Sequence, residues 1–246
     1  MSSSLTGLII ILGVLLIYSI SLLWQKRKKY TDLFYEKRSA QNLRQQIANS
    51  IEEGLMVHCD ICNLEGTGTF SEGTLTAIQT TQKLSNQLSS ADEPLIITSN
   101  DSALTFFSKD AYYQGLKNSG LANEFDPNQS VFAGYSPLSH QSGITGILEG
   151  EVSTFHLNIG AFGPEIALQD SAFDPSEGII AAGDNLAAQA VSYVTADDVF
   201  IGEKIFELPQ IIQEKPEMDS GLIAMDIFRF GIIIALVIGA ALMILF

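Results

Sequence analysis

The sequence predicts an α/β fold: a mainly parallel sheet with helices on both faces (Rossmann-like), flanked by N- and C-terminal transmembrane helices. Two observations lead to this prediction. Short apolar runs alternate with longer segments of helical periodicity, which is typical of βαβ units. A 20-residue apolar run also stands near each terminus, long enough to cross a bilayer core of about 30 Å.

The terminal runs are Leu5 to Trp24, which carries no charge, and Ile227 to Phe246, whose only charge is Arg229. A basic cluster at residues 25–29 directly follows the first run, and the positive-inside rule places that side in the cytoplasm. We therefore expect an integral protein of the cell (inner) membrane, with the lipid bilayer as a partner. It would have two spans, both termini outside and the domain between the spans in the cytoplasm.

Between these runs, helices and strands are expected to alternate. Apolar residues at helical spacing predict an amphipathic helix from Tyr30 to Glu53 that docks on the domain. The predicted strands are Leu55 to His58, Leu95 to Thr98, Thr154 to Ile159 and Ile179 to Ala182, with an edge strand at Ser130 to Tyr135. The predicted helices are Thr74 to Leu88, Ala103 to Asn118, Ser139 to Glu149, Pro164 to Ala172, Asn185 to Val194 and Ile201 to Phe206.

The domain organisation follows from these elements. We expect an N-terminal transmembrane helix over residues 1–25, a basic juxtamembrane amphipathic helix over 26–53 and the α/β domain over 54–206. A linker over 207–225, which contains Pro209, Pro216 and Gly221, would lead to a C-terminal transmembrane helix over 226–246.

Charge is distributed unevenly along the chain. Residues 45–225 hold 25 of the 28 acidic residues but only five of the 13 basic ones, an excess of 20 negative charges. Binding to nucleic acid depends on a positive patch, so we expect no nucleic acid partner for the domain. Solubility accounts for such a surface, and a cationic ligand or divalent ion is the alternative.

The candidate ligand site is the edge of the sheet at which the predicted strands end. In open parallel sheets this edge binds ligands where the strand order reverses. The same polar and glycine residues also cap helices, so a purely structural role is the alternative. The candidate ligand-binding residues are His58, Gly66, Gly68, Ser99, Asn100, Asp101, Gly160, Gly163, Glu165, Asp184 and Asn185.

Several known chemistries lack their motifs in this sequence. The turn after the first strand has no P-loop lysine, and its third glycine, Gly73, lies too far on for a dinucleotide fingerprint. A Gly-x-Ser-x-Gly nucleophile elbow is also missing. We therefore expect no cofactor and assign no catalytic residues, and an enzyme is the less expected class of protein.

The Cys59-x-x-Cys62 pair is the sequence's most conspicuous motif. Structural zinc sites usually need two such pairs, and these are the only cysteines. A thioredoxin-type pair begins a helix, whereas Gly66 and Gly68 separate this one from the next helix. We expect inert thiols and no metal.

Two further patterns leave alternatives open. Thr154, His156 and Asn158 share one face of a predicted strand, so that face either contacts water or lines a pocket. Gly231, Ala235 and Gly239 form a stripe of small residues at which a second helix could pack closely.

Several stretches resemble an uncharacterised family of bacterial membrane proteins, a domain of unknown function. They are LIITSND at 95–101, NIGAFGPEIAL at 158–168, AAGDNLAAQA at 181–190 and IGEKIF at 201–206. The resemblance covers roughly residues 45–246. It implies a cytoplasmic α/β domain and a C-terminal transmembrane helix, but no activity.

These observations predict a membrane-anchored acidic domain that acts as a self-associating scaffold or assembly subunit, hence a homo-oligomer. The alternative is a small-molecule-binding or sensing module that holds a small polar ligand at the sheet edge. Less expected is an enzyme that uses Glu165, Asp184 or His58 as acid or base.

Overall fold

The structure is a computed structural model that describes residues 13–20, 37–63, 69–93, 95–149, 152–174, 177–213, 224–234 and 236. The chain divides into two compact units, one formed by Glu36–Lys215 and the other by Met1–Tyr35 with Pro216–Phe246. The first unit contains the sheet and is described below.

The predicted α/β fold is confirmed. The sheet contains six parallel strands in the order β3-β2-β1-β4-β5-β6. The strands are β1 (Met56–Asn63), β2 (Leu95–Ser99), β3 (Ser130–Phe132), β4 (Ser153–Ala161), β5 (Gly178–Gly183) and β6 (Asp198–Val199). The order reverses between β1 and β4, which is the point at which doubly wound sheets bind ligands.

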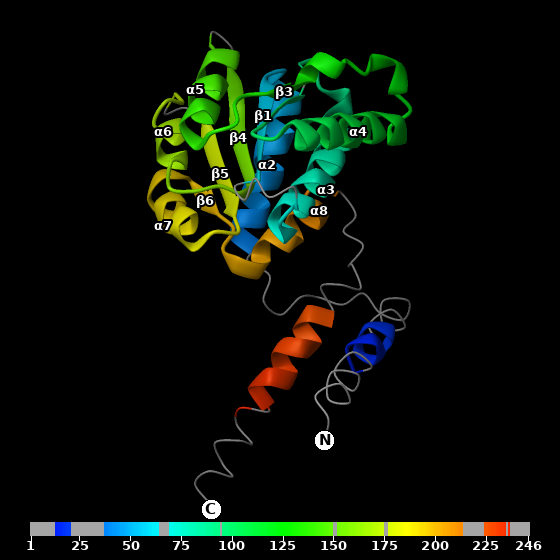
Figure 1. Cartoon of the computed structure of the whole chain (residues 1–246). Coiled ribbons are helices and arrows are strands. Elements are labelled where there is room, and N and C mark those ends of the chain that lie inside the picture. Colours follow the sequence, from blue (N-terminus) through cyan, green and yellow to red (C-terminus); the bar gives the residue numbers. More distant parts are fainter. Residues whose placement is uncertain are drawn as a thin grey trace, which may run out of the picture. The chain divides into compact units, whose positions relative to one another are not determined.

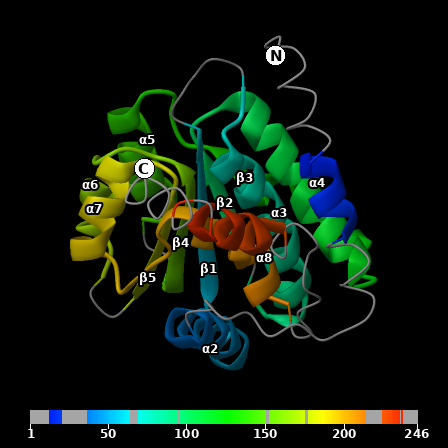
Figure 2. The same cartoon turned by 90° about the horizontal axis from the view of Figure 1, so that it is seen from below.

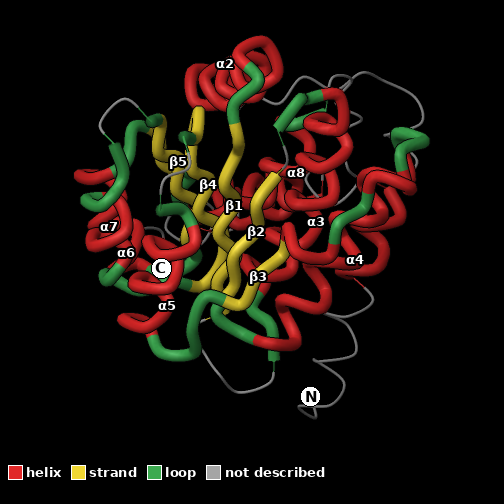
Figure 3. Tube along the Cα trace, turned by 90° about the horizontal axis from the view of Figure 1, so that it is seen from above, coloured by secondary structure: helices red, strands yellow, loops and turns green. Residues whose placement is uncertain are grey.

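Helices cover both faces of the sheet, with α3 and α4 on one side and α5, α6 and α7 on the other (Figure 1). The helices are α2 (Lys37–Glu53), α3 (Glu72–Gln87), α4 (Ser102–Asn118), α5 (Pro137–Ile147), α6 (Ile166–Asp170), α7 (Leu186–Thr195) and α8 (Leu208–Ile211). Seen from above, the strands run between the two groups of helices (Figure 3).

The two faces of the sheet differ in chemistry because side chains alternate along each strand. Toward α3, β1 and β4 present apolar residues that are at most 1% exposed: Val57, Cys59, Ile61, Phe155, Leu157 and Ile159. Toward α5 and α6, the same strands present His58, Asp60, His156 and Asn158, which are at most 2% exposed. Polar groups buried in this way must pair with one another.

The predicted amphipathic helix is α2, and its described part packs on the domain as expected. Ala40, Leu43 and Ile47 are buried, and α2 contacts β4, β6 and α8. Arg44 Nε donates to the carbonyl of Ile211 at 2.7 Å. Figure 2 shows α2 beneath the strands.

Element boundaries differ from the prediction at several places, among them the following three. Strand β1 extends five residues beyond His58, so the whole Cys-x-x-Cys segment belongs to the strand. The short β6 was not predicted. The predicted helix at Ile201 to Phe206 is a 3-10 helix at Gly202–Glu207, and α8 follows it inside the predicted linker.

The prediction of an integral membrane protein with two spans, and with it the placement of the termini outside and the domain in the cytoplasm, is wrong. Among the described residues, no helix combines the length and the apolar character needed to cross a membrane. The described helical stretches that overlap the predicted spans are 13–20 and 224–234, and the second contains an ion pair between Arg229 and Asp226 at 3.4 Å. In the predicted stripe of small residues, Gly231 is described, while Ala235 and Gly239 lie outside the described residues.

Candidate functional site

A cavity of about 210 Å³, here called the edge cavity, opens at the carboxyl edge of the sheet beside the reversal of strand order. Its lining comes from the ends of β1 and β2, the start of α5 and the turn before α6. The lining residues are Cys62, Asn63, Asn100, Asp101, Tyr135, Ser136, Pro137, His140 and Glu165. The predicted edge therefore contains a cavity, and part of the predicted set of residues lines it.

Three predicted residues, Asn100, Asp101 and Glu165, line the edge cavity, although each also has a structural role. Asn100 exchanges two hydrogen bonds with the backbone of Asn63, at 2.8 and 3.1 Å. Asp101 caps α4 by accepting from the N–H groups of Ala103 and Leu104.

The other predicted edge residues that the structure describes do not line the edge cavity. Ser99 contacts Thr105, Asp184 accepts from Ser71 at 2.6 Å, and Asn185 caps α7. Gly163 donates its N–H to Glu165 at 3.0 Å. Gly160 has a φ of +115° within β4, and Gly66 and Gly68 lie outside the described residues. Helix capping, the structural alternative, thus explains Asn185 and one role of Asp101.

His58 was predicted at the carboxyl edge, and that placement is wrong. It lies in the middle of β1, is fully buried, and pairs in register with His156 of β4 and Ile96 of β2. Burial, with His156 adding to it, lowers the pKa of His58 to about 3. His58 is therefore neutral at physiological pH.

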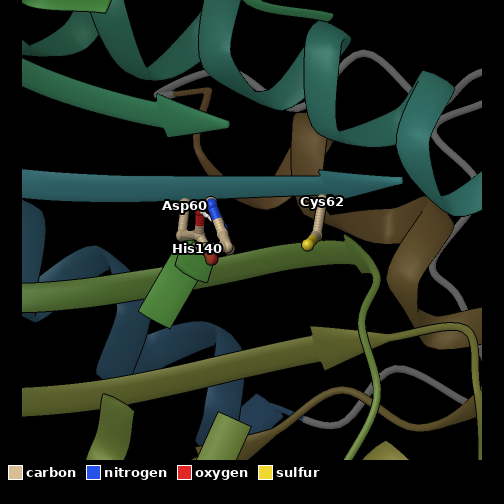
Figure 4. A group of neighbouring side chains, drawn as sticks. All are labelled: Asp60, Cys62 and His140. Atoms are coloured by element: carbon tan, nitrogen blue, oxygen red, sulfur yellow. Dashed lines mark hydrogen bonds and ion pairs between the residues drawn. The ribbon is translucent and has the colours of Figure 1, made fainter. Parts of the chain in front are cut away.

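Two lining residues, Cys62 and His140, lie close to Asp60, and these three residues were not predicted as a group. Asp60 and Cys62 are two positions apart on β1 and project to the same side of the sheet, where His140 approaches from α5 (Figure 4). Their potential metal-binding atoms all lie within 4.8 Å of one another. Because side chains alternate along a strand, the sequence could have placed Asp60 and Cys62 on the same face of β1. His140 is 80 residues from Asp60 in the sequence, and only the fold brings the two together.

Asp60 and His140 form a buried ion pair, with His140 Nε2 at 2.9 Å from Asp60 Oδ1. Burial lowers the pKa of His140, but the charge and hydrogen bond of Asp60 outweigh burial and raise it above its usual value. The other ring nitrogen, Nδ1, is buried and has no hydrogen-bond partner among the described residues. An orphaned buried nitrogen beside a cavity is costly unless a ligand or ordered water satisfies it.

The two cysteines occupy different environments because residues three apart on a strand point to opposite faces. Cys59 faces α3, 3.8 Å from the Thr81 hydroxyl, whereas Cys62 lines the edge cavity. Burial raises the pKa of Cys59 to about 12 and that of Cys62 well above its usual value. Without a further partner both are neutral thiols, and they cannot act as a chelating or redox pair with each other.

A chain of buried hydrogen bonds, here called the histidine chain, runs from Asp60 to the opposite end of the sheet. The Thr98 hydroxyl donates to Asp60 Oδ1 at 2.8 Å and lies 2.9 Å from His58 Nε2. His58 Nδ1 is 3.1 Å from His156 Nδ1. His156 Nε2 in turn lies 3.0 Å from Glu177 Oε2 and 2.8 Å from the Ser153 hydroxyl.

The far end of the histidine chain opens into a second cavity of about 650 Å³ near the start of β4, which Ser153, His156, Phe173 and Glu177 help to line. The ring of Phe173 stacks on His156 with centroids 3.3 Å apart and planes 2° from parallel. The polar face of β4 was predicted either to contact water or to line a pocket, and at His156 it lines a pocket. Contact of the whole face with water is wrong, because every residue of β4 is buried.

A neighbouring cluster on the same face of the sheet contains an acid with a strongly shifted pKa. Asp170 of α6 accepts from Asn158 Nδ2 at 3.3 Å and from the Thr195 hydroxyl. Burial raises the pKa of Asp170 to about 6, against about 3.9 in an unfolded chain. The folded protein therefore holds a proton that the unfolded chain releases between these two values.

This difference predicts how stability depends on pH. The contribution of Asp170 is fully present below about pH 4 and is lost as pH rises through about 6, a total of roughly 3 kcal/mol. Asp170→Asn should therefore have a free energy of unfolding that falls less than that of the wild type between about pH 5 and about pH 8. Urea denaturation at several pH values measures this. Asp110→Asn, at an exposed position on α4, is the control and should follow the wild type; a parallel decline for Asp170→Asn would contradict the assignment.

The fold and the cavity define a class: a doubly wound α/β domain with a cavity at its topological switch point. The chain belongs to a family described as a domain of unknown function, DUF6754, whose model matches residues 3–246. No curated protein and no solved structure matches the chain. The predicted resemblance to a family of unknown function is confirmed at this level.

Proposed function

We propose that the domain is a binding module that holds a small ligand, positively charged or rich in hydrogen-bond donors, in the edge cavity. The observation that carries the proposal is the lining of that cavity. Its described side chains include the carboxylates of Asp101 and Glu165, but no lysine or arginine. Such a lining attracts cations and repels anions.

The position of the edge cavity supports the same proposal. Doubly wound domains bind ligands at the carboxyl edge, where the strand order reverses. A volume of about 210 Å³ admits only a small ligand. The excess of acidic residues in the domain adds a long-range attraction for a positive charge.

A thermal stabilisation assay on the full chain tests this proposal. With a chelator present, a panel of small amines, polyamines and polyols is added, and we expect at least one compound to raise Tm. A ligand at 100 times its Kd adds about 2.7 kcal/mol to the free energy of unfolding. Glu165→Gln should weaken this stabilisation because it removes a carboxylate from the lining of the edge cavity.

The control is Asp184→Asn, which removes a carboxylate at the same edge of the sheet but outside the lining. It should respond to the ligand as the wild type does. The proposal is wrong if no compound raises Tm, or if Glu165→Gln and wild type are stabilised equally.

Self-association as a scaffold or assembly subunit stays a prediction, because the structure of one chain does not test it. An enzymatic role for His58 is disfavoured by its place in the middle of a strand. His58 is 0% exposed and lines neither the edge cavity nor the second cavity. A general acid or base must come within hydrogen-bond reach of its substrate.

A further inference from the structure

Cys62 and His140, which line the edge cavity, and the neighbouring Asp60 offer one sulfur, one nitrogen and one oxygen donor. Asp60, Cys62 and His140 are at most 4% exposed, and their donor atoms lie within 4.8 Å of one another (Figure 4). We propose that these three residues form a zinc-binding site whose fourth coordination position opens into the edge cavity. The inference rests on the proposed function, since it names a divalent cation as a ligand of the same cavity.

The donor set favours zinc over other common cations. Thiolate and imidazole ligands select zinc and neighbouring transition metals, whereas magnesium and calcium prefer oxygen ligands alone. Zinc binds sulfur at about 2.3 Å and nitrogen or oxygen at about 2.1 Å, so its tetrahedral ligands stand roughly 3.5 Å apart. Donor atoms already within 4.8 Å need shifts of about an ångström to reach this geometry.

Charge balance also fits a divalent ion. The carboxylate of Asp60 and a thiolate at Cys62 would together neutralise Zn²⁺, with His140 as a neutral ligand. Cys62 is buried and forms no disulfide. A coordinating metal ion deprotonates a thiol outright, so metal binding would supply a partner for this sulfur.

The surroundings of the three residues provide the supports that metal ligands need. Thr98 donates to Asp60 and helps to fix the orientation of its carboxylate, as groups that hydrogen-bond to metal ligands do. Cys62 itself belongs to an apolar cluster that includes Phe162, Ile166 and Ala181. His140 has an unpartnered buried nitrogen in the absence of metal, an independent sign that its present contacts are incomplete.

Three protein ligands and one open position are the arrangement of zinc sites that bind an exchangeable group. Glu165 lines the same cavity as Cys62 and His140. The open position faces a cavity with this carboxylate in its wall. The site would thus accept water or a small ligand atom as its fourth ligand.

Cobalt titration of the metal-stripped full chain tests the zinc site without any organic ligand. Co²⁺ bound by Cys62 should produce a thiolate-to-cobalt charge-transfer band in the near ultraviolet and strong visible bands typical of four-coordination. Added Zn²⁺ should displace Co²⁺ and abolish these bands. Cys62→Ser should lose the charge-transfer band, while Cys59→Ser, on the opposite face of the same strand, should retain it.

Asp60→Asn and His140→Gln should each weaken Co²⁺ binding by more than about tenfold. Circular dichroism establishes which variants fold. X-ray absorption of the zinc-loaded wild type needs no variant and should find one sulfur at about 2.3 Å. The zinc site is refuted by a cobalt spectrum without the thiolate band, by a zinc environment without sulfur, or by Cys62→Ser binding as tightly as the wild type.

These outcomes separate the zinc site from the proposed function. A chain that is stabilised by an organic compound in the presence of chelator but binds no Co²⁺ refutes the zinc site and supports the binding module. A chain that binds Co²⁺ through Cys62 while no organic compound stabilises it supports the zinc site and refutes the organic ligand.

Discussion

Gly160→Ala is expected to lower the free energy of unfolding by about 3 kcal/mol or more. Gly160 has a φ of +115°, a conformation that side-chain-bearing residues rarely adopt. A Cβ at this position would also overlap the carbonyl oxygen of Cys62, its partner residue on β1. The substitution therefore has two costs. It strains the backbone of residue 160, and the added Cβ pushes β4 away from β1 next to the edge cavity.

Urea denaturation of the full chain measures this loss, with Gly146→Ala as the matched control. Gly146 is an exposed residue of α5, and a Cβ there meets no atom within 4 Å. Alanine in a helix is preferred over glycine by about 0.5–1 kcal/mol, so this variant should be as stable as the wild type or slightly more stable. If Gly160→Ala matches Gly146→Ala in stability, the close approach of β4 to β1 is not as described.

His58→Leu should cost about 2 to 3 kcal/mol, because it leaves Nδ1 of His156 buried without its partner. The double variant His58→Leu/His156→Phe removes both ends of that contact. Ser153 and Glu177 keep their mutual hydrogen bond at 2.9 Å, and a phenyl ring can still stack on Phe173. The double variant should therefore cost less than the two single variants added together, by about 1 to 3 kcal/mol.

A double-mutant cycle by urea denaturation gives this coupling energy directly. Leu157→Ala on the apolar face of β4 serves as the uncoupled comparison, because its side chain points away from the histidine chain. In the double variant His58→Leu/Leu157→Ala, the loss in free energy of unfolding should equal the sum of the losses in the two single variants. Strict additivity of His58→Leu and His156→Phe would show that the contact between the two rings contributes nothing to stability.

The sheet and its helices were largely predictable because apolar periodicity reports burial. Strand β4 and helix α4 were recognised from patterns that tertiary contacts reinforce. The end of β1 was not recognised, since Asp60 and Asn63 look like turn residues and are rare inside strands. In the fold, Asp60 is tolerated because His140 and Thr98 pair with it.

The location of the site was predictable, but its central residues were not. The turns that follow parallel strands lie at one edge of the sheet. This rule correctly placed Asn100, Asp101 and Glu165 at the edge cavity. Local sequence could not show that α5 crosses over the sheet to place His140 beside Asp60. Nor could it separate capping from binding at Asn185, because both uses select the same residue types.

The hydroxyl of Thr98 gives the histidine chain a direction. It has a single proton, which it donates to Asp60, so it must accept from Nε2–H of His58. Neutral His58 then has a bare Nδ1, which can only accept from Nδ1–H of His156. Between His156 and Asp60, every hydrogen thus points toward Asp60. The carboxylate of Asp60 therefore determines that His58 carries its hydrogen on Nε2 and that His156 carries one on Nδ1. If Asp60 were neutralised, nothing would fix these positions of the hydrogens.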